Sequence, residues 1–155
     1  MKKLIYAAAF TFLLASNLRA IAGGAMQNAN VAHLVGSAAT PNRAGFQGAT
    51  HRFDVHVQGR SLSEIAIALP DDLSIRGGIE VKNQSGQKIE SQVSVNNQRA
   101  TVVFAQPVAP DTTISIYMRG INTPGYSRNW GYVISAKMVG INAEMPLGRV
   151  GIQTY

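Results

Sequence analysis

The sequence predicts an all-β protein, an immunoglobulin-like antiparallel β-sandwich preceded by a helical signal peptide that is cleaved. Two observations predict the sandwich: apolar and polar residues alternate in several short runs, and turn-forming residues separate these runs at intervals of about 8–12 residues. A third observation concerns helices. Beyond the N-terminal segment no apolar pattern at helical spacing persists for three turns, so the signal peptide is the only helix that we expect.

The first 22 residues have the three parts of an export signal. A basic start at Lys2 and Lys3 is followed by an apolar run, Leu4 to Ser16, that is too short to span a bilayer. Ala20-Ile21-Ala22 then supplies a small-x-small cleavage signal, so we expect cleavage near Ala22 and an extracytoplasmic protein, either periplasmic or secreted. No later apolar run approaches the length of a membrane span, and we expect none in the mature form.

Two segments follow the signal peptide. Residues 23–48 are rich in Gly, Ala, Asn and Ser, which predicts an extended lead-in. Residues 49–155 contain the alternating runs, and their number suits a single β-sandwich domain that buries its own core.

The first half of this domain contains three expected strands. Residues 52–57 alternate between apolar and polar side chains, as a strand with one buried face requires. Residues 65–69 alternate Ile or Leu with Ala until Pro70-Asp71-Asp72 turns the chain. Residues 79–81 form another strand, which the turn signal Asn83-Gln84-Ser85-Gly86 ends.

The second half contains the remaining strands. A hairpin is predicted where the runs 93–95 and 101–104 flank Asn96-Asn97. Further strands, separated by turn signals at 107–111 and 122–125, are expected at residues 114–118, 132–139 and 150–152.

Composition excludes several classes of function. The chain has no cysteine, so disulfides and thiolate metal sites are excluded and packing alone must hold the fold. Its formal charge of +6 falls to +3 in the mature chain, because Lys2, Lys3 and Arg19 leave with the signal peptide and no acidic residue does. The other basic residues are scattered singly from Arg43 to Arg149, so we expect no nucleic-acid partner.

Three parts of the chain carry a resemblance to a known family. They are Thr50-His51-Arg52-Phe53, the stretch Gln106 to Ile116, and Asn122 to Arg128 followed by Pro146-Leu147-Gly148. Over about residues 31–155 the chain resembles exported cyanobacterial proteins known only as a domain of unknown function, family 2808. The resemblance implies a signal peptide, a compact β domain and an extracytoplasmic location. It implies no catalytic residues, and His51 stands where the family pattern has an aromatic residue.

The candidate binding segment is Tyr126 to Tyr132, which contains Tyr126, Arg128, Trp130 and Tyr132 just after a turn signal. Exposed aromatic rings and a guanidinium offer the contact area and the polar groups that sugars, peptides or protein partners bind. Alternatively, the segment forms a corner in which Trp130 fills the core. We favour the core for Trp130, because a sole tryptophan in a small β domain is mostly buried.

Histidine and methionine suggest an alternative function, the handling of a copper-type metal ion in the periplasm. His51 and His56 are five residues apart, so on one strand they face opposite sides and cannot share a metal. His33 lies in the expected lead-in. The remaining candidates lie among aliphatic residues, where Met usually fills gaps in the core: Met118, Met138 and Met145. We therefore assign no metal site and no cofactor.

A catalytic interpretation fits the sequence less well. Arg52, Asp54 and His56 share the outward face of one expected strand, but no Gly-x-Ser-x-Gly or comparable motif supplies a nucleophile for a hydrolase. We expect these side chains to stabilise the sheet, and we assign no catalytic residue. The expected function is a non-catalytic binding or cell-envelope accessory module whose partner is a protein or an envelope glycan.

Overall fold

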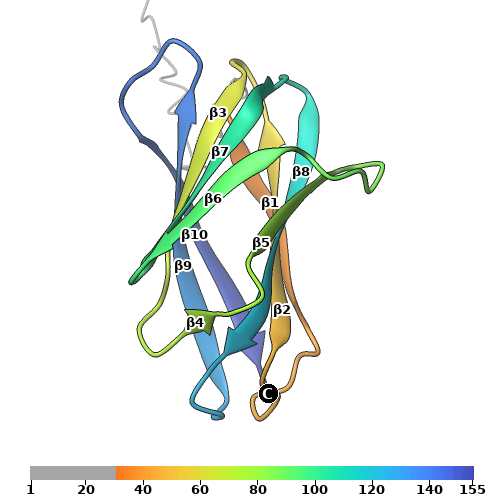
Figure 1. Cartoon of the computed structure of the whole chain (residues 1–155), viewed down its shortest axis with the longest axis vertical. Helices are drawn as coiled ribbons and strands as arrows, with labels where there is room; N and C mark the ends of the chain where they lie inside the picture. Colours follow the sequence, from red (N-terminus) through yellow and green to blue (C-terminus); the bar gives the residue numbers. More distant parts are fainter. Residues whose placement is uncertain (1–30) are drawn as a thin grey trace, which may run out of the picture.

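The structure is a computed structural model that describes residues 31–155, and the predicted signal peptide lies outside this part. Two antiparallel sheets pack face to face (Figure 1). One contains β1 (His33–Thr40), β2 (Ala49–Val57), β4 (Ser74–Ile75), β5 (Ile79–Asn83) and β8 (Thr112–Asn122). The other contains β3 (Leu62–Ala68), β6 (Ser91–Asn96), β7 (Arg99–Val108), β9 (Arg128–Met138) and β10 (Met145–Thr154). The predicted all-β sandwich is confirmed.

The order of the strands decides which edges are free. In the first sheet β1, β2 and β8 are neighbours, and both β4 and β5 pair with the far side of β8. In the second sheet the order is β10, β9, β3, β7, β6, so β10 and β6 are its two edges. The edge strands β1 and β10 lie close together, since the Ser37 hydroxyl donates to the Gly151 carbonyl at 3.2 Å.

The sandwich begins earlier than the composition suggests. Strand β1 lies within the segment that we expected to be a lead-in, and it pairs with β2 from His33, opposite His56, to Thr40, opposite Thr50. The sheet therefore starts at residue 33 and not at residue 49. Small side chains such as those of Gly36 and Ala38 give β1 little apolar alternation, so its pairing with β2 is not visible in the local pattern.

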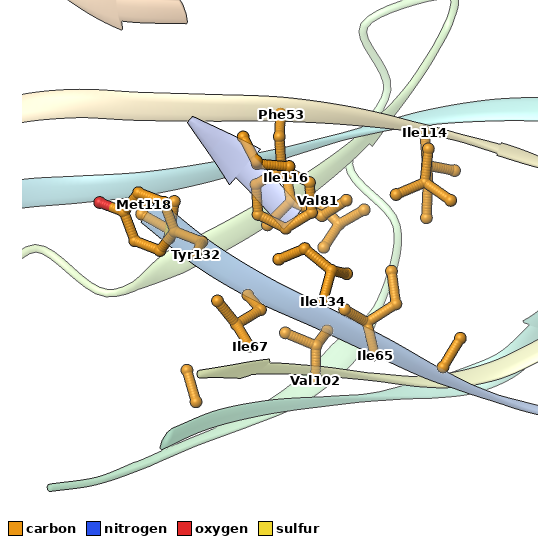
Figure 2. Packing of buried hydrophobic residues seen from close by; sticks show 14 of the residues in the cluster. Phe53, Ile65, Ile67, Val81, Val102, Ile114, Ile116, Met118, Tyr132 and Ile134 are labelled. Carbon is orange, nitrogen blue, oxygen red and sulfur yellow. The ribbon is translucent and has the colours of Figure 1, made fainter. Parts of the chain in front are cut away.

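The core lies between the sheets and comes from the alternating residues. Every second residue of β2 is buried, and β9 follows the same pattern. Figure 2 shows side chains from the two sheets facing one another across this layer, with Phe53 and Ile116 on one side and Ile67, Val102 and Ile134 on the other. Without a disulfide, burial of these side chains supplies most of the stability.

The predicted hairpin is present, and so is the turn predicted after β5, whereas Pro107, expected in a turn, lies within β7. Val93 and Val95 lie in β6, which pairs with β7 around the turn at Asn97, a residue with φ of 51°. Asparagine tolerates this left-handed conformation better than most residues. The Asn83 side chain accepts hydrogen bonds from the backbone N–H groups of Ser85 and Gln87 at 3.0 Å, which fixes the turn after β5.

Candidate functional site

The candidate segment, residues 126–132, is divided between the core and the surface. Strand β9 begins at Arg128, earlier than predicted, so residues 128–132 alternate between the two faces of a sheet. Trp130 and Tyr132 point inward and are 0% exposed, whereas Tyr126 is 47% exposed. The rings of Trp130 and Tyr132 therefore do not face a partner. Of the four candidate binding residues, Tyr126 and Arg128 are the two that reach the surface.

Trp130 fills one end of the sandwich. Its Nε1–H donates to the Thr154 hydroxyl at 3.1 Å, and both residues are buried. Outside it, the Arg128 guanidinium lies 5.0 Å from the centroid of the Trp130 ring and donates to the Tyr126 hydroxyl at 3.2 Å. A guanidinium at this distance from an indole is in a cation–π contact. Arg128 is thus held in place at the surface by two aromatic residues.

Tyr132 is bound to His51 inside the sandwich. The Tyr132 hydroxyl lies 2.6 Å from Nδ1 of His51, which is 1% exposed, and no described residue bonds its Nε2. Burial lowers the pKa of His51 to about 4 and raises the pKa of the Tyr132 phenol above its usual value. Both groups are therefore neutral at pH 7, and the pair acts as a structural link.

A hollow lies next to Arg128 on the outer face of β9 and β10. Its volume is about 390 Å³. Gly131 and Gly151 lie directly opposite each other in the two strands, so neither adds a side chain to the floor of the hollow, over which the side chains of Asn129 and Arg149 extend. We call this site the β9–β10 hollow. Its lining residues are Pro70, Asp71, Arg128, Asn129, Gly131, Arg149 and Gly151.

The side chains around this floor are hydrogen-bond donors and charges. A Cβ on Gly151 would lie 2.8 Å from Oδ1 of Asn129, and one on Gly131 would lie 3.7 Å from Cδ of Arg149. Arg128 and Arg149 carry positive charge and Asp71 carries negative charge. Within residues 31–155, neither arginine forms an ion pair. Such guanidinium groups suit a carboxylate, a phosphate or a sulfate.

A second hollow, on the outer face of the first sheet, differs in its charge. It has a volume of about 300 Å³ and contains Arg52, Tyr117 and Arg119. Both arginines already have partners: Arg52 pairs with Asp54 at 3.3 Å and Arg119 pairs with Glu80 at 2.7 Å. The hydrogen bond from Arg119 lowers the pKa of the Glu80 carboxyl. The β9–β10 hollow is therefore the better site for an anion.

The row of Arg52, Asp54 and His56 is bonded across the sheet. The Ser115 hydroxyl donates to Asp54 at 2.6 Å, and Nδ1 of His56 lies 2.9 Å from the Thr113 hydroxyl. Among the described residues no hydrogen bond joins Asp54 to His56. The row links β2 to β8, in agreement with the predicted stabilising role.

The histidines are arranged as their spacing predicts, with one addition. His51 is buried and His56 lies on the opposite, outer face of β2. His33 lies opposite His56 in β1, and the ring centroids are 5.3 Å apart. This pair was missed because β1 was not predicted. In the described part of the chain no group of three His, Cys, Asp or Glu residues surrounds a potential metal position.

The glycines of the hollow carried a signal that our sequence reasoning did not use. An isolated glycine within a strand pattern indicates a bulge or a close approach to the backbone. Gly131 interrupts the run before Tyr132, and Gly151 lies between Val150 and Ile152. Their register across β9 and β10 is what makes them one site.

No helix among residues 31–155 is long and apolar enough to cross a bilayer. The chain belongs to a family that is described as a protein of unknown function (DUF2808), whose model matches residues 26–150. The resemblance drawn from the sequence is confirmed at the level of that family. No curated protein matches the chain.

Solved structures with a similar fold include an adhesin domain, a pilin subunit and a hydrophobin. The N-terminal domain of the Streptococcus gordonii adhesin Sgo0707 aligns with a TM-score of 0.55 at 14% identity, over 81% of this chain and 32% of that one. A variant of BcpA, the major pilin subunit of Bacillus cereus, aligns with a TM-score of 0.54 at 11% identity, over 80% and 39%. BslA, described as a bacterial hydrophobin, aligns with a TM-score of 0.53 at 14% identity, over 81% and 95%.

At these identities the likeness establishes the immunoglobulin-like sandwich fold and nothing more specific. The chain spans about a third of the adhesin chain and about two fifths of the pilin chain.

Proposed function

We propose that this chain is an exported, non-catalytic binding module of the cell envelope, and that its β9–β10 hollow binds a glycan with anionic groups. The observation that carries the proposal is the pair Arg128 and Arg149 beside a floor formed by Gly131 and Gly151. Two guanidinium groups without acidic partners in the described part of the chain supply donors for an anion, and the Asn129 amide over Gly151 adds a further polar group.

A protein or an envelope glycan was expected as the partner, and the shape of the hollow favours the glycan. A volume of about 390 Å³ suits a small ligand or one or two units of a polymer. The exposed Tyr126 is hydrogen-bonded to Arg128, which lines the hollow, and a longer glycan could extend to its aromatic ring. Aromatic rings with adjacent polar groups provide contact area for sugar rings at low entropic cost.

The buried polar residues support a non-catalytic role. Within residues 31–155 these are His51 and Thr154, and each bonds to a core aromatic residue. On the surface, Asp54 and His56 bond separately to β8. Activation of a nucleophile requires a base that is itself oriented by a third group, and this pair does not provide that arrangement.

The binding proposal is tested by calorimetric titration with two probes, oligogalacturonate and its neutral methyl ester. We expect the anionic probe to bind more tightly, and Arg149→Ala or Arg128→Ala to weaken its binding by about tenfold, the change that corresponds to 1.4 kcal/mol. Arg76→Ala, which removes an exposed arginine elsewhere, is the control and leaves binding unchanged. Equal binding of both probes, no binding, or cleavage of the probe contradicts the proposal.

The proposal of export rests on the first 22 residues and requires its own test. The full chain with a C-terminal tag is expressed and the cells are fractionated. A protein that begins at Gly23 and is found outside the cytoplasm supports export. An intact chain that begins at Met1 and stays in the cytoplasm contradicts it.

A second candidate function, metal handling, is favoured by the pair His33 and His56. Nδ1 of His33 lies 3.2 Å from the Val31 carbonyl and Nδ1 of His56 lies 2.9 Å from the Thr113 hydroxyl, so Nε2 of each ring is the nitrogen left for a metal. Titration with Cu(II) tests this function. Stoichiometric binding that is lost in His33→Ala and in His56→Ala supports it, and binding that survives both changes contradicts it.

A further inference from the structure

Strand β6 is a free edge of the second sheet. Among residues 31–155 no strand pairs with its outer side, and five of its six residues are exposed. Natural edge strands are usually protected by charge, proline or a bulge. The sequence of β6, Ser91 to Asn96, has no charge and no proline, and its register with β7 is continuous. The edge is therefore open to pairing with another strand.

Two apolar side chains of β6 are partly exposed to solvent. Val93 lies opposite Val102 and Val95 lies opposite Ala100, and both partners are buried in the core. Because opposed residues in a sheet share one face, Val93 and Val95 point toward the inner side of the sandwich. They are nevertheless 37% and 41% exposed. A strand added next to β6 would cover part of this surface.

The sequence around Ser94 is symmetric in its chemistry. Valine stands on each side of Ser94, and an amide side chain stands two residues away on each side, at Gln92 and Asn96. In an antiparallel pair of identical strands centred on Ser94, residue 93 of one copy lies opposite residue 95 of the other. Valine then faces valine, and amide faces amide.

We propose that this chain pairs with a second copy of itself through β6, antiparallel and centred on Ser94, so that the second sheet continues across both copies. A two-fold axis through Ser94 relates the copies, as isologous dimers require. Like charges do not meet in this register, because the paired strand Ser91–Asn96 contains no charged residue. An unrelated strand could bond to the same backbone, but the mirrored side chains fit a second copy in particular.

The proposed pairing has a consequence for the β9–β10 hollow. Strand β10 is the edge of the second sheet opposite β6. A two-fold axis perpendicular to the sheet keeps the same face of both copies on one side. The dimer would therefore present two hollows at the far edges of one continuous surface, which would raise the avidity for a polymer with repeated units. The pairing itself does not depend on what the hollow binds.

Single-cysteine variants test the register directly, because the natural chain has no cysteine. Ser94→Cys places two thiols opposite each other across the axis, within the range of a disulfide. Asn96→Cys separates its two copies by four residues, roughly 14 Å along the strand, which is too far for a disulfide. We expect mild oxidation to link Ser94→Cys into a dimer, to leave Asn96→Cys monomeric, and to link Asn96→Cys with Gln92→Cys when they are mixed. Equal linking of Ser94→Cys and Asn96→Cys overturns the proposal.

Sedimentation velocity of the purified protein provides a second test. We expect the protein to shift from monomer to dimer as its concentration rises, and Val95→Lys to abolish the dimer. Val133→Lys is the matched control, because Val133 is 39% exposed but lies on the outer face of β9, away from β6. It should leave the dimer intact. A protein that stays monomeric at every concentration, or that loses its dimer equally in both variants, contradicts the pairing.

Discussion

His51 of β2 and Tyr132 of β9 join the two sheets by a hydrogen bond of 2.6 Å that is buried in the core. The bond places the only buried imidazole of the described chain beside a phenol, and no charged group contributes to the shift of its pKa. Burial alone therefore sets its protonation, with a pKa of about 4 in the folded protein against 6.5 in an unperturbed histidine.

The first prediction concerns stability in acid. Between pH 6.5 and pH 4 the unfolded chain binds a proton at His51 that the folded chain does not bind, so the free energy of unfolding falls as the pH falls. The loss attributable to His51 approaches about 3 kcal/mol below pH 4. Urea denaturation at pH 7 and at pH 4 measures it.

Two variants separate this effect from other acid effects. His51→Phe removes the titrating group but leaves the Tyr132 hydroxyl without a partner, at a cost of about 1–3 kcal/mol at neutral pH. Adding Tyr132→Phe removes the unpartnered hydroxyl and restores part of that stability. Both variants should lose less stability than the natural chain between pH 7 and pH 4. An unchanged pH dependence in both would show that His51 is not responsible.

The second prediction concerns the end of the sandwich at Trp130. Thr154→Val leaves the buried indole N–H without an acceptor and should lower the free energy of unfolding by about 1–3 kcal/mol. Thr154→Ser keeps the hydroxyl and should cost less. Because Trp130 is the only tryptophan of the chain, its fluorescence reports both unfolding and local exposure. Equal stability of the Val and Ser variants would argue against this hydrogen bond.

The third prediction concerns the floor of the β9–β10 hollow. Gly131→Val adds a side chain in contact with Arg149 at the floor of the hollow and is a residue that strands favour, so it should weaken binding of oligogalacturonate at least about tenfold without lowering stability. Ser135→Val makes a similar addition farther along the same face of β9 and should leave binding unchanged. Calorimetric titration measures the affinity of both variants for oligogalacturonate. Comparable binding by the two would place the ligand elsewhere.

The fourth prediction tests whether the row of Arg52, Asp54 and His56 on the outer face of β2 contributes to stability and not to binding. Asp54→Asn removes the ion pair with Arg52 and weakens the hydrogen bond from Ser115, so the free energy of unfolding should fall by about 1 kcal/mol. Binding of oligogalacturonate should not change, since Asp54 lies on the other sheet. A loss of binding without a loss of stability would instead assign the row a functional role.

Much of the fold was predictable from local pattern. Strands such as β2 and β8 alternate apolar and polar residues because one face of each is buried, and the pattern is visible without knowledge of the partner strand. Strand β1 was not predictable in this way. Its small residues show little alternation, and its position depends on pairing with β2, which is a property of the folded chain.

The candidate site was predicted in part. The segment from Tyr126 to Tyr132 was identified because it contains aromatic residues and an arginine just after a turn signal. Trp130 was expected in the core because a sole tryptophan in a small β domain is mostly buried. The hollow was not predicted. It requires Gly131 to lie opposite Gly151 and Arg149 to lie beside them, and this register is set by how β9 and β10 pair in the folded chain, which the local sequence pattern does not show.

The most direct test of the binding proposal is a titration of isotope-labelled protein with oligogalacturonate, followed by the backbone amide signals in NMR spectra. We predict that the largest shifts occur at Gly131, Arg149 and Gly151 and that the neutral methyl ester causes much smaller ones. Shifts confined to the face around Tyr117, or no shifts at any residue, would contradict the assignment of the β9–β10 hollow as the binding site.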